Sequence, residues 1–105
     1  MHIIKMHEIE GKVLKSGVRV KELIKNENVK VMNLKLKPED SVPAHSVPVG
    51  VFFYVVAGKG TIVIGGEAGV VQRDDIVLCP AGTEMSLVAD QGEDFSVLNI
   101  KTPSI

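Results

Sequence analysis

His45 is the residue of this chain whose surroundings raise a chemical question. It stands in the stretch PAHSVPVGVFFYVVAGKG (residues 43–60), which otherwise consists mainly of valine, phenylalanine, proline and glycine. An imidazole can ligate a metal ion, act as a general base or hydrogen-bond a ligand. A general base needs a partner that orients it, and the sequence shows neither a nucleophile–base pair nor a carboxylate pair. We therefore assign no catalytic residue and interpret His45 as a binding residue.

The remaining residues of reactive types have structural interpretations. Cys79 is the only cysteine, and it ends an apolar run just before the turn PAG. A free cysteine is commonly a buried small hydrophobe, and we expect that role rather than a metal ligand or a nucleophile. Asp74 and Asp75 are adjacent, so their side chains diverge on a strand, and a capped or solvated turn is expected. His2 and His7 lie in the N-terminal segment and are expected to be exposed and inert.

Size and charge exclude several classes of function. The 105 residues, 45% hydrophobic and 24% charged, fit one globular domain over residues 1–105. Twelve Lys and Arg against thirteen Asp and Glu are scattered along the chain, so nucleic acid is not an expected partner. The lysine-rich stretch 12–37 alternates with apolar residues. This pattern favours the solvent face of strands, and the alternative is the steering of an acidic ligand.

The sequence also bears on location. No apolar run approaches the roughly 18–20 residues needed to cross a bilayer, so a membrane is not an expected partner. The opening residues MHIIKMHEIEGK contain two acids and lack the apolar core of a secretory signal. A single cysteine cannot form an internal disulfide, which agrees with a reducing compartment. We therefore expect a cytoplasmic protein.

The elements that would position His45 are short strands. Apolar runs stop repeatedly at Gly, Pro, Asn or Asp, and no apolar stripe of helical period is present. The glycines of GKG (58–60) and GGEAG (65–69) tolerate positive φ, while KPED (37–40) and CPAG (79–82) begin turns with proline. The pattern predicts strands at 12–16, 18–25, 29–37, 42–47, 51–57, 60–64, 68–73, 75–79, 83–89 and 94–101. Such a chain is nearly all β, and strands joined this way make a sandwich or a barrel.

Two stretches carry a resemblance to a known family. EDSVPAHSVPVGVFFYVVAGKG, followed by RDDIVLCPAGTEMSLV, resembles the paired motifs of the small single-domain cupins of the cupin-2 type. In that family the first motif runs Gly, five residues, His-x-His, three or four residues, Glu, six residues, Gly. The second motif runs Gly, five residues, Pro-x-Gly, two residues, His. The resemblance covers residues 39 to about 89 and implies an all-β double-stranded β-helix, or jelly-roll barrel.

The same resemblance implies that the family's metal site is degenerate here. The first histidine of the family falls on His45, but the second falls on Val47, the glutamate on Val51 and the last histidine on Met85. Valine and a thioether are not donors for Mn, Fe or Zn, and one ligand does not hold a metal ion. We therefore predict neither a metal nor another cofactor. Glu39 and Asp74 replace the leading glycines of the two motifs, and Glu84 is expected to face away from Met85.

If the register of the resemblance holds, the barrel lumen is mainly apolar. Strand alternation then places six residues in a ligand pocket: His45, Val47, Val51, Phe53, Met85 and Leu87. Two outcomes follow. These side chains fill the lumen completely, or they leave a cleft for a small, mainly apolar ligand with one hydrogen-bonding or anionic group. Phe52, Phe53 and Tyr54 cannot all face inward, so an outward aromatic predicts a covered outer face and a homodimer.

The functional expectation follows from this lumen. The leading hypothesis is a metal-free, non-enzymatic barrel that binds a small molecule or serves as a sensory or scaffold module. One alternative is a cupin-type enzyme on a small organic substrate, using His45 with unexpected metal donors or as a general base. The other alternative is a purely structural dimeric barrel with a filled core.

Overall fold

The computed structural model describes all 105 residues, and its regular secondary structure is almost entirely strand. The elements are η1 (Met6–Glu8), β1 (Lys12–Val13), β2 (Arg19–Lys25), β3 (Lys30–Leu36), β4 (Ser41–His45), β5 (Gly50–Ile64), β6 (Glu67–Gln72), β7 (Ile76–Cys79), β8 (Met85–Ala89) and β9 (Phe95–Thr102). This confirms the all-β expectation. None of the helical structure is long and apolar enough to span a bilayer.

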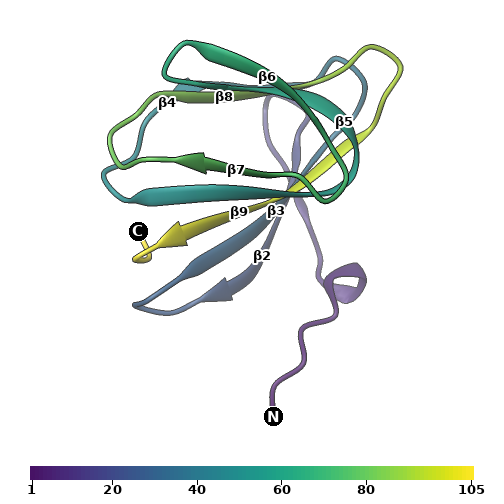
Figure 1. The fold of residues 1–105 in the computed structure, drawn as a ribbon. Helices are drawn as coiled ribbons and strands as arrows, with labels where there is room; N and C mark the ends of the chain where they lie inside the picture. The colour runs from purple at the N-terminus through teal and green to yellow at the C-terminus, as the bar shows by residue number, and fades with distance from the viewer.

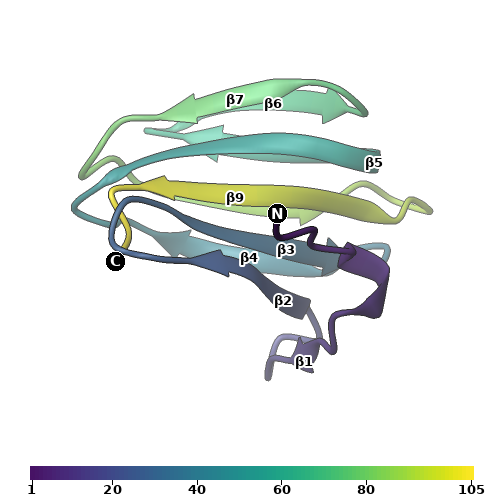
Figure 2. The same cartoon turned by 90° about the horizontal axis from the view of Figure 1, so that it is seen from below.

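The strands form two layers that face each other (Figure 1), and we call the space between them, much of which side chains fill, the lumen. The first layer runs β1-β2-β3-β9 and continues through the first half of β5 to β7. The second layer consists of β4, β8, the second half of β5, and β6. Seen from below, the strands of the first layer lie side by side, and the N-terminal segment runs outside them (Figure 2). All strand pairs are antiparallel, as in a jelly roll.

β5 corrects one detail of the predicted elements. The sequence pattern divides this region into strands 51–57 and 60–64 with a break at GKG, whereas the structure has one strand over Gly50–Ile64. The pairing with β9 shifts register between Val55 and Ala57, and Gly58 has a φ of 80°. A Cβ on Gly58 would overlap the Asp94 carbonyl, and one on Gly60 would overlap the Phe95 ring. The glycines therefore let one strand bend from layer to layer, as bulges do.

The turn expected in GGEAG is confirmed, and it is tight. Gly65 and Gly66 have φ values of 57° and 85°, and Ile64 lies directly opposite Glu67. Two consecutive positive φ angles in a two-residue hairpin are the geometry of a type I′ turn. Glycine adopts these angles without a steric penalty, so β5 and β6 form a hairpin with fixed register.

Two non-glycine residues also have positive φ: Glu39 at 70° and Asp74 at 74°. These are the positions where the family pattern has its leading glycines, so the structure retains the glycine conformation although the side chains differ. Asp74 accepts a hydrogen bond from Tyr54 Oη to Oδ1 at 2.6 Å, which supports its conformation. Glu39 is exposed and has no such bond to offset the left-handed conformation.

Replacing Glu39 by glycine should therefore stabilise the protein. The left-handed conformation costs a residue with a Cβ roughly 1–2 kcal/mol, and the extra flexibility of unfolded glycine returns about half of that. We expect Glu39→Gly to raise the free energy of unfolding by about 0.5–1 kcal/mol in urea denaturation. Glu39→Ala, which keeps the Cβ, is the control and should give no such gain. Equal stability of the two variants would contradict this interpretation.

Candidate functional site

The structure places the six expected lumen residues at different depths. Val51, Phe53, Met85 and Leu87 are buried in one apolar cluster, and Val47 packs against it. Their burial shows that this part of the lumen is filled by side chains. His45, by contrast, is exposed at the end of β4. Glu84 is exposed and Met85 buried, as strand alternation predicts.

One part of the lumen is open. A pocket of about 210 Å³, which we call the lumen pocket, lies between the first layer and strands β4 and β8. Of the six expected residues only His45 and Leu87 line it. Its full lining is Leu14, Val18, Val20, Met32, Leu34, Val42, His45, Leu87, Asn99 and Lys101. Seven of these ten residues are hydrophobic, so three polar side chains stand in an otherwise apolar wall.

His45 reaches this pocket through an irregularity in β4. The pairing of β4 with β8 shifts register between Val42, opposite Leu87, and His45, opposite Met85. This bulge brings both Val42 and His45 to the pocket although three positions separate them. His45 Nδ1 lies 3.0 Å from the Pro43 carbonyl oxygen. Because a carbonyl oxygen only accepts, Nδ1 is the donor of this bond, and Nε2 is left available to a ligand.

Asn99 is the most unusual polar group of the pocket. It is 6% exposed, and its Oδ1 has no hydrogen-bond partner. On the neighbouring strand Asn33 is 3% exposed, but its Nδ2 donates to Ser96 Oγ at 2.9 Å and to the Val97 carbonyl at 3.0 Å. Leaving a buried polar group unpaired costs roughly 1–3 kcal/mol, and such groups are few in folded proteins. The two asparagines differ because Asn33 faces outward, while Asn99 faces the pocket.

Lys101 places a cation beside Asn99. On β9 the side chains of Phe95, Val97, Asn99 and Lys101 alternate onto the inner face. Lys101 lies opposite Lys30 on β3 and opposite Val51 on β5. The pKa of Lys101 is lowered mainly by burial and, to a smaller extent, by the charge of Lys30. The ion pairs in the structure are His7–Glu8 and Arg73–Asp74, so no carboxylate compensates this ammonium group.

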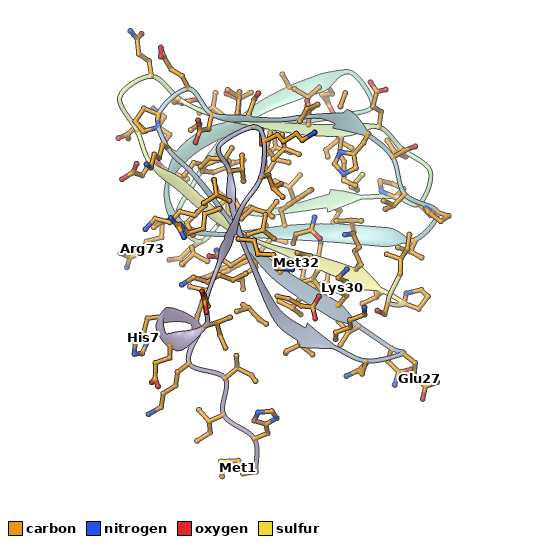
Figure 3. All side chains as sticks on the ribbon, turned by 180° about the vertical axis from the view of Figure 1, so that it is seen from behind. Met1, His7, Glu27, Lys30, Met32 and Arg73 are labelled. Atoms are coloured by element: carbon orange, nitrogen blue, oxygen red, sulfur yellow. The ribbon has the colours of Figure 1, made fainter.

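Sequence reasoning missed Asn99 and Lys101, although the signal was present. The predicted strand 94–101 begins with Phe95 and Val97, and the same alternation extends to positions 99 and 101. The interpretation of the lysine-rich stretch as a solvent face holds for Lys35, which is exposed on the outer face of β3. It fails for Lys30, which shares the inner face with Met32 (Figure 3).

The residues present do not fit the metal centre of the family. Of the four pattern positions only His45 is a donor, and Val51 and Met85 are buried hydrocarbon and thioether groups in the core. No three His, Cys, Asp or Glu side chains converge anywhere in the chain on a geometry that could hold a metal ion. Val51 also lies directly opposite Lys101, so a positive side chain stands next to the position where the family pattern has glutamate.

The other reactive residues have structural roles. Cys79 is 2% exposed, its Sγ lies 3.5 Å from the Thr83 carbonyl, and burial raises the pKa of its thiol. The hydrogen bond to Asp74, and then the charge of that carboxylate, raise the pKa of Tyr54. Asp75 Oδ2 accepts from the Gln72 backbone N–H at 2.9 Å, as expected for a capped turn. His7 lies outside the barrel, 3.6 Å from Glu8 (Figure 3).

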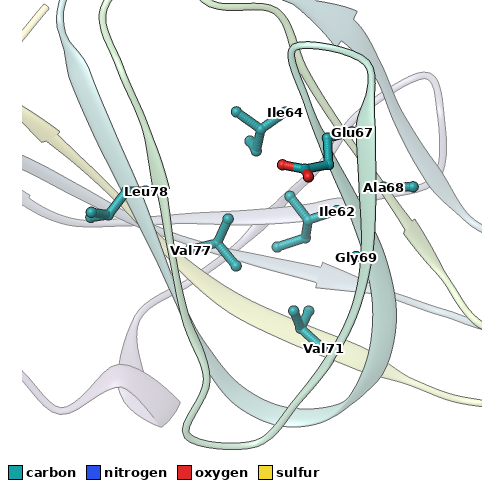
Figure 4. A pocket seen from close by; sticks show the side chains of 8 residues that line it. All are labelled: Ile62, Ile64, Glu67, Ala68, Gly69, Val71, Val77 and Leu78. Carbon is teal, nitrogen blue, oxygen red and sulfur yellow. The ribbon is translucent and has the colours of Figure 1, made fainter.

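A larger pocket, of about 400 Å³, lies between the β5–β6 hairpin and β7. Ile62, Ile64, Glu67, Val71 and Val77 point toward its opening, whereas Leu78 points away from it (Figure 4). Glu67 is its only charged side chain, and that side chain is exposed. The lumen pocket is smaller, but it brings together an imidazole, an ammonium group and an unpaired amide, so it is the better candidate site.

Comparisons with known proteins agree with this fold. The sequence profile of the Cupin domain family matches residues 32–101, and the chain therefore belongs to the cupin family. A search of curated proteins finds no match. Among solved structures, an RmlC-like cupin from Shewanella frigidimarina superposes with a TM-score of 0.90 at 15% identity, covering 99% of this chain and 92% of that one.

Two further structures are similar in fold and carry different names. The polyketide cyclase RemF from Streptomyces resistomycificus has a TM-score of 0.87 at 16% identity, with 99% of this chain and 80% of that chain covered. A predicted oxalate decarboxylase from Thermotoga maritima has a TM-score of 0.91 at 18% identity, with 97% of this chain and 99% of that chain covered. At such identities the likeness extends to the barrel and not to an activity.

Proposed function

We propose that this cupin binds a small organic molecule in the lumen pocket, without a metal ion. The observation that carries the proposal is the unpaired Oδ1 of Asn99, which is buried at the wall of an open cavity. A fold that leaves such a group unpaired inside gains free energy when a bound molecule supplies the partner. His45 Nε2 and the Lys101 ammonium group offer further polar contacts beside the same apolar wall.

The size of the pocket limits the ligand. About 210 Å³ corresponds to roughly seven water molecules at ~30 Å³ each. Pockets for drug-sized ligands are larger, roughly 300–1,000 Å³. The ligand is therefore a small molecule with a short apolar body rather than a nucleotide or a peptide. We propose that it is a cytoplasmic metabolite, because the free Cys79 agrees with a reducing compartment.

Filling the pocket should weaken binding. Val20 lines the lumen pocket, so Val20→Phe should obstruct it, whereas Val70 is 63% exposed on β6 and serves for the matched Val70→Phe control. We expect ligand-observed NMR on a mixed panel of charged and neutral small amphiphiles to detect binding to the wild type and to the control. Val20→Phe, with its fold verified by circular dichroism, should weaken that binding by about tenfold or more. Absence of any bound compound would favour a purely structural barrel, and unchanged binding to a folded Val20→Phe would place the ligand outside the lumen pocket.

We also propose that the protein is a homodimer through the outer face of the first layer. The register of five neighbouring strands aligns five apolar residues, which we call the outer stripe: Ile24, Val31, Ile100, Phe52 and Leu78. At strand spacings near 4.8 Å this stripe is roughly 19 Å wide. Leu78 is 72% exposed, and the adjacent Ile76 is 62% exposed.

A second copy is the occupant that this face suits. The outer stripe carries no charge, and it runs across the sheet, so two copies related by a two-fold axis bring like surfaces together. Phe53 is buried in the lumen, whereas Phe52 and Tyr54 are half-buried on the outer side. The alternation of adjacent residues on a strand requires the three aromatic side chains to face opposite sides in this way. Covering Phe52 and Leu78 removes large apolar side chains from water.

A charge in the outer stripe should dissociate the dimer. We expect sedimentation velocity at micromolar concentration to show a dimer for the wild type and a monomer for Leu78→Lys, because burying an unpaired ammonium group is costly. Val70→Lys alters a comparably exposed residue, 63% against 72%, on β6 outside the stripe and should stay dimeric. A monomeric wild type would contradict the proposal, and a monomeric Val70→Lys would place the interface elsewhere.

A further inference from the structure

The inner face of the first layer carries three lysines side by side. The β2–β3 register places Lys25 opposite Lys30, and the β3–β9 register places Lys30 opposite Lys101. We call Lys25, Lys30 and Lys101 the lysine row. A bulge between Glu22 and Ile24 is what turns Lys25 to the inner face, because Ile24 pairs with the outward Val31. The three lysines therefore lie in register on adjacent strands at one end of the lumen, where Lys25 is exposed and Lys30 and Lys101 are half-buried.

This arrangement is unfavourable unless an anion is present. Like charges directly opposite each other on neighbouring strands are destabilising, and the effect grows where solvent is excluded. None of the three lysines takes part in an ion pair. The nearest inner-face acid in register is Glu22, opposite Met32, and it lines an adjoining groove together with Glu10 and Lys12 rather than the lumen pocket. Lys30 and desolvation both act against the charged form of Lys101.

The row meets the lumen pocket at Lys101 and Asn99. Lys101 is the member of the row that lines the pocket, and Asn99 is the next inner-face residue on the same strand. Two positions along a strand separate Cα atoms by roughly 6.5 Å, which one small polar head group bridges. The Asn99 amide has both a donor and an acceptor, and a half-turn about its last bond exchanges them. Leu14, Val18 and Leu34 belong to the apolar wall of the same pocket.

We infer that the ligand of the lumen pocket is a small carboxylic acid whose carboxylate faces Lys101 and Asn99 and whose apolar body lies against the pocket wall. This inference rests on the proposed function and deepens it by naming the class of ligand. A carboxylate only accepts, so it pairs with the Lys101 ammonium group and with Asn99 Nδ2 after the amide has turned Nδ2 toward the pocket in place of the unpaired Oδ1. Charge-assisted bonds of this kind are the stronger ones. The apolar part of such an acid is short, because the pocket is small.

Calorimetry with ligands that share one apolar chain tests whether the pocket prefers a carboxylate head group. Hexanoate, hexan-1-ol and hexylamine share one apolar chain and differ in charge, and inorganic phosphate carries charge without an apolar body. We expect the wild type to bind hexanoate about tenfold or more tightly than hexanol, and to bind hexylamine and phosphate more weakly still. Hexanol binding as tightly as hexanoate would overturn the inference while leaving the proposed function standing. Phosphate binding as tightly as hexanoate would make the row a general anion site and would also overturn it.

Variants test the residues. Lys101→Met keeps the length of the side chain and removes the charge, and it should weaken hexanoate binding by about tenfold while changing hexanol binding less than about threefold. Lys35→Met removes an exposed lysine from the outer face of β3 and should leave both affinities unchanged. Lys101→Gln, which also removes the charge, provides the same test if Lys101→Met does not fold. Unchanged hexanoate binding in a folded row variant would overturn the assignment, as would failure of hexanoate to bind the wild type.

Discussion

The close approach of β5 to β9 is the constraint on which the rest of the structure depends. Asp94 and Phe95 lie where any Cβ at positions 58 and 60 would be, so glycine is required at both. This contact lets β5 lie beside β9 and β7 in one layer and beside β8 and β6 in the other. A continuous strand thereby joins the two layers. Its register determines which side chains of the neighbouring strands face the lumen and which face outward. Every inner-face residue, including Asn99 and Lys101, takes its position from that assignment.

The lumen has a packed part and an open part, and the open part has a basic and an amide side chain in a mainly apolar wall. Side chains of Val51, Phe53 and Met85 occupy the region where the family pattern has metal donors. The positive charge in this lumen belongs to the protein, since Lys101 stands opposite Val51 and next to Lys30. A site of this kind repels a divalent cation and attracts an anion. The same barrel that holds a cation in the family pattern is, on this account, suited to a carboxylate.

Much of this fold could be predicted from the sequence, because its determinants are local. Short apolar runs that stop at Gly, Pro, Asn or Asp indicated the strands, and paired glycines indicated the β5–β6 turn. The continuity of β5 could not be predicted locally, because it depends on Asp94 and Phe95, which are far away in the sequence. The residues predicted for the ligand pocket have two different placements in the structure. His45 and Leu87 do line the lumen pocket, whereas Val51, Phe53 and Met85 fill the core beside it.

The polar residues of the site could be identified only from the pairing register of the strands. Asn99 and Lys101 are ordinary in the sequence, and alternation within β9 places them on one face but does not say what they meet. Only the pairing with β3 reveals that Lys101 lies opposite Lys30, and only the packed barrel shows that Asn99 lacks a partner while Asn33 has two. Bulges in β2 and β4 add to the difficulty, because each reverses the face on which later residues lie.

The central claim is that the fold keeps an unsatisfied polar group at Asn99 for a ligand, and the free energy of unfolding of the ligand-free protein tests it most directly. Asn99→Leu replaces the amide by an apolar group of similar size. The account predicts that this change raises the free energy of unfolding by about 1–2 kcal/mol. Asn33→Leu, which removes two made hydrogen bonds, should lower it instead. A loss of stability in Asn99→Leu comparable to that in Asn33→Leu would contradict the account.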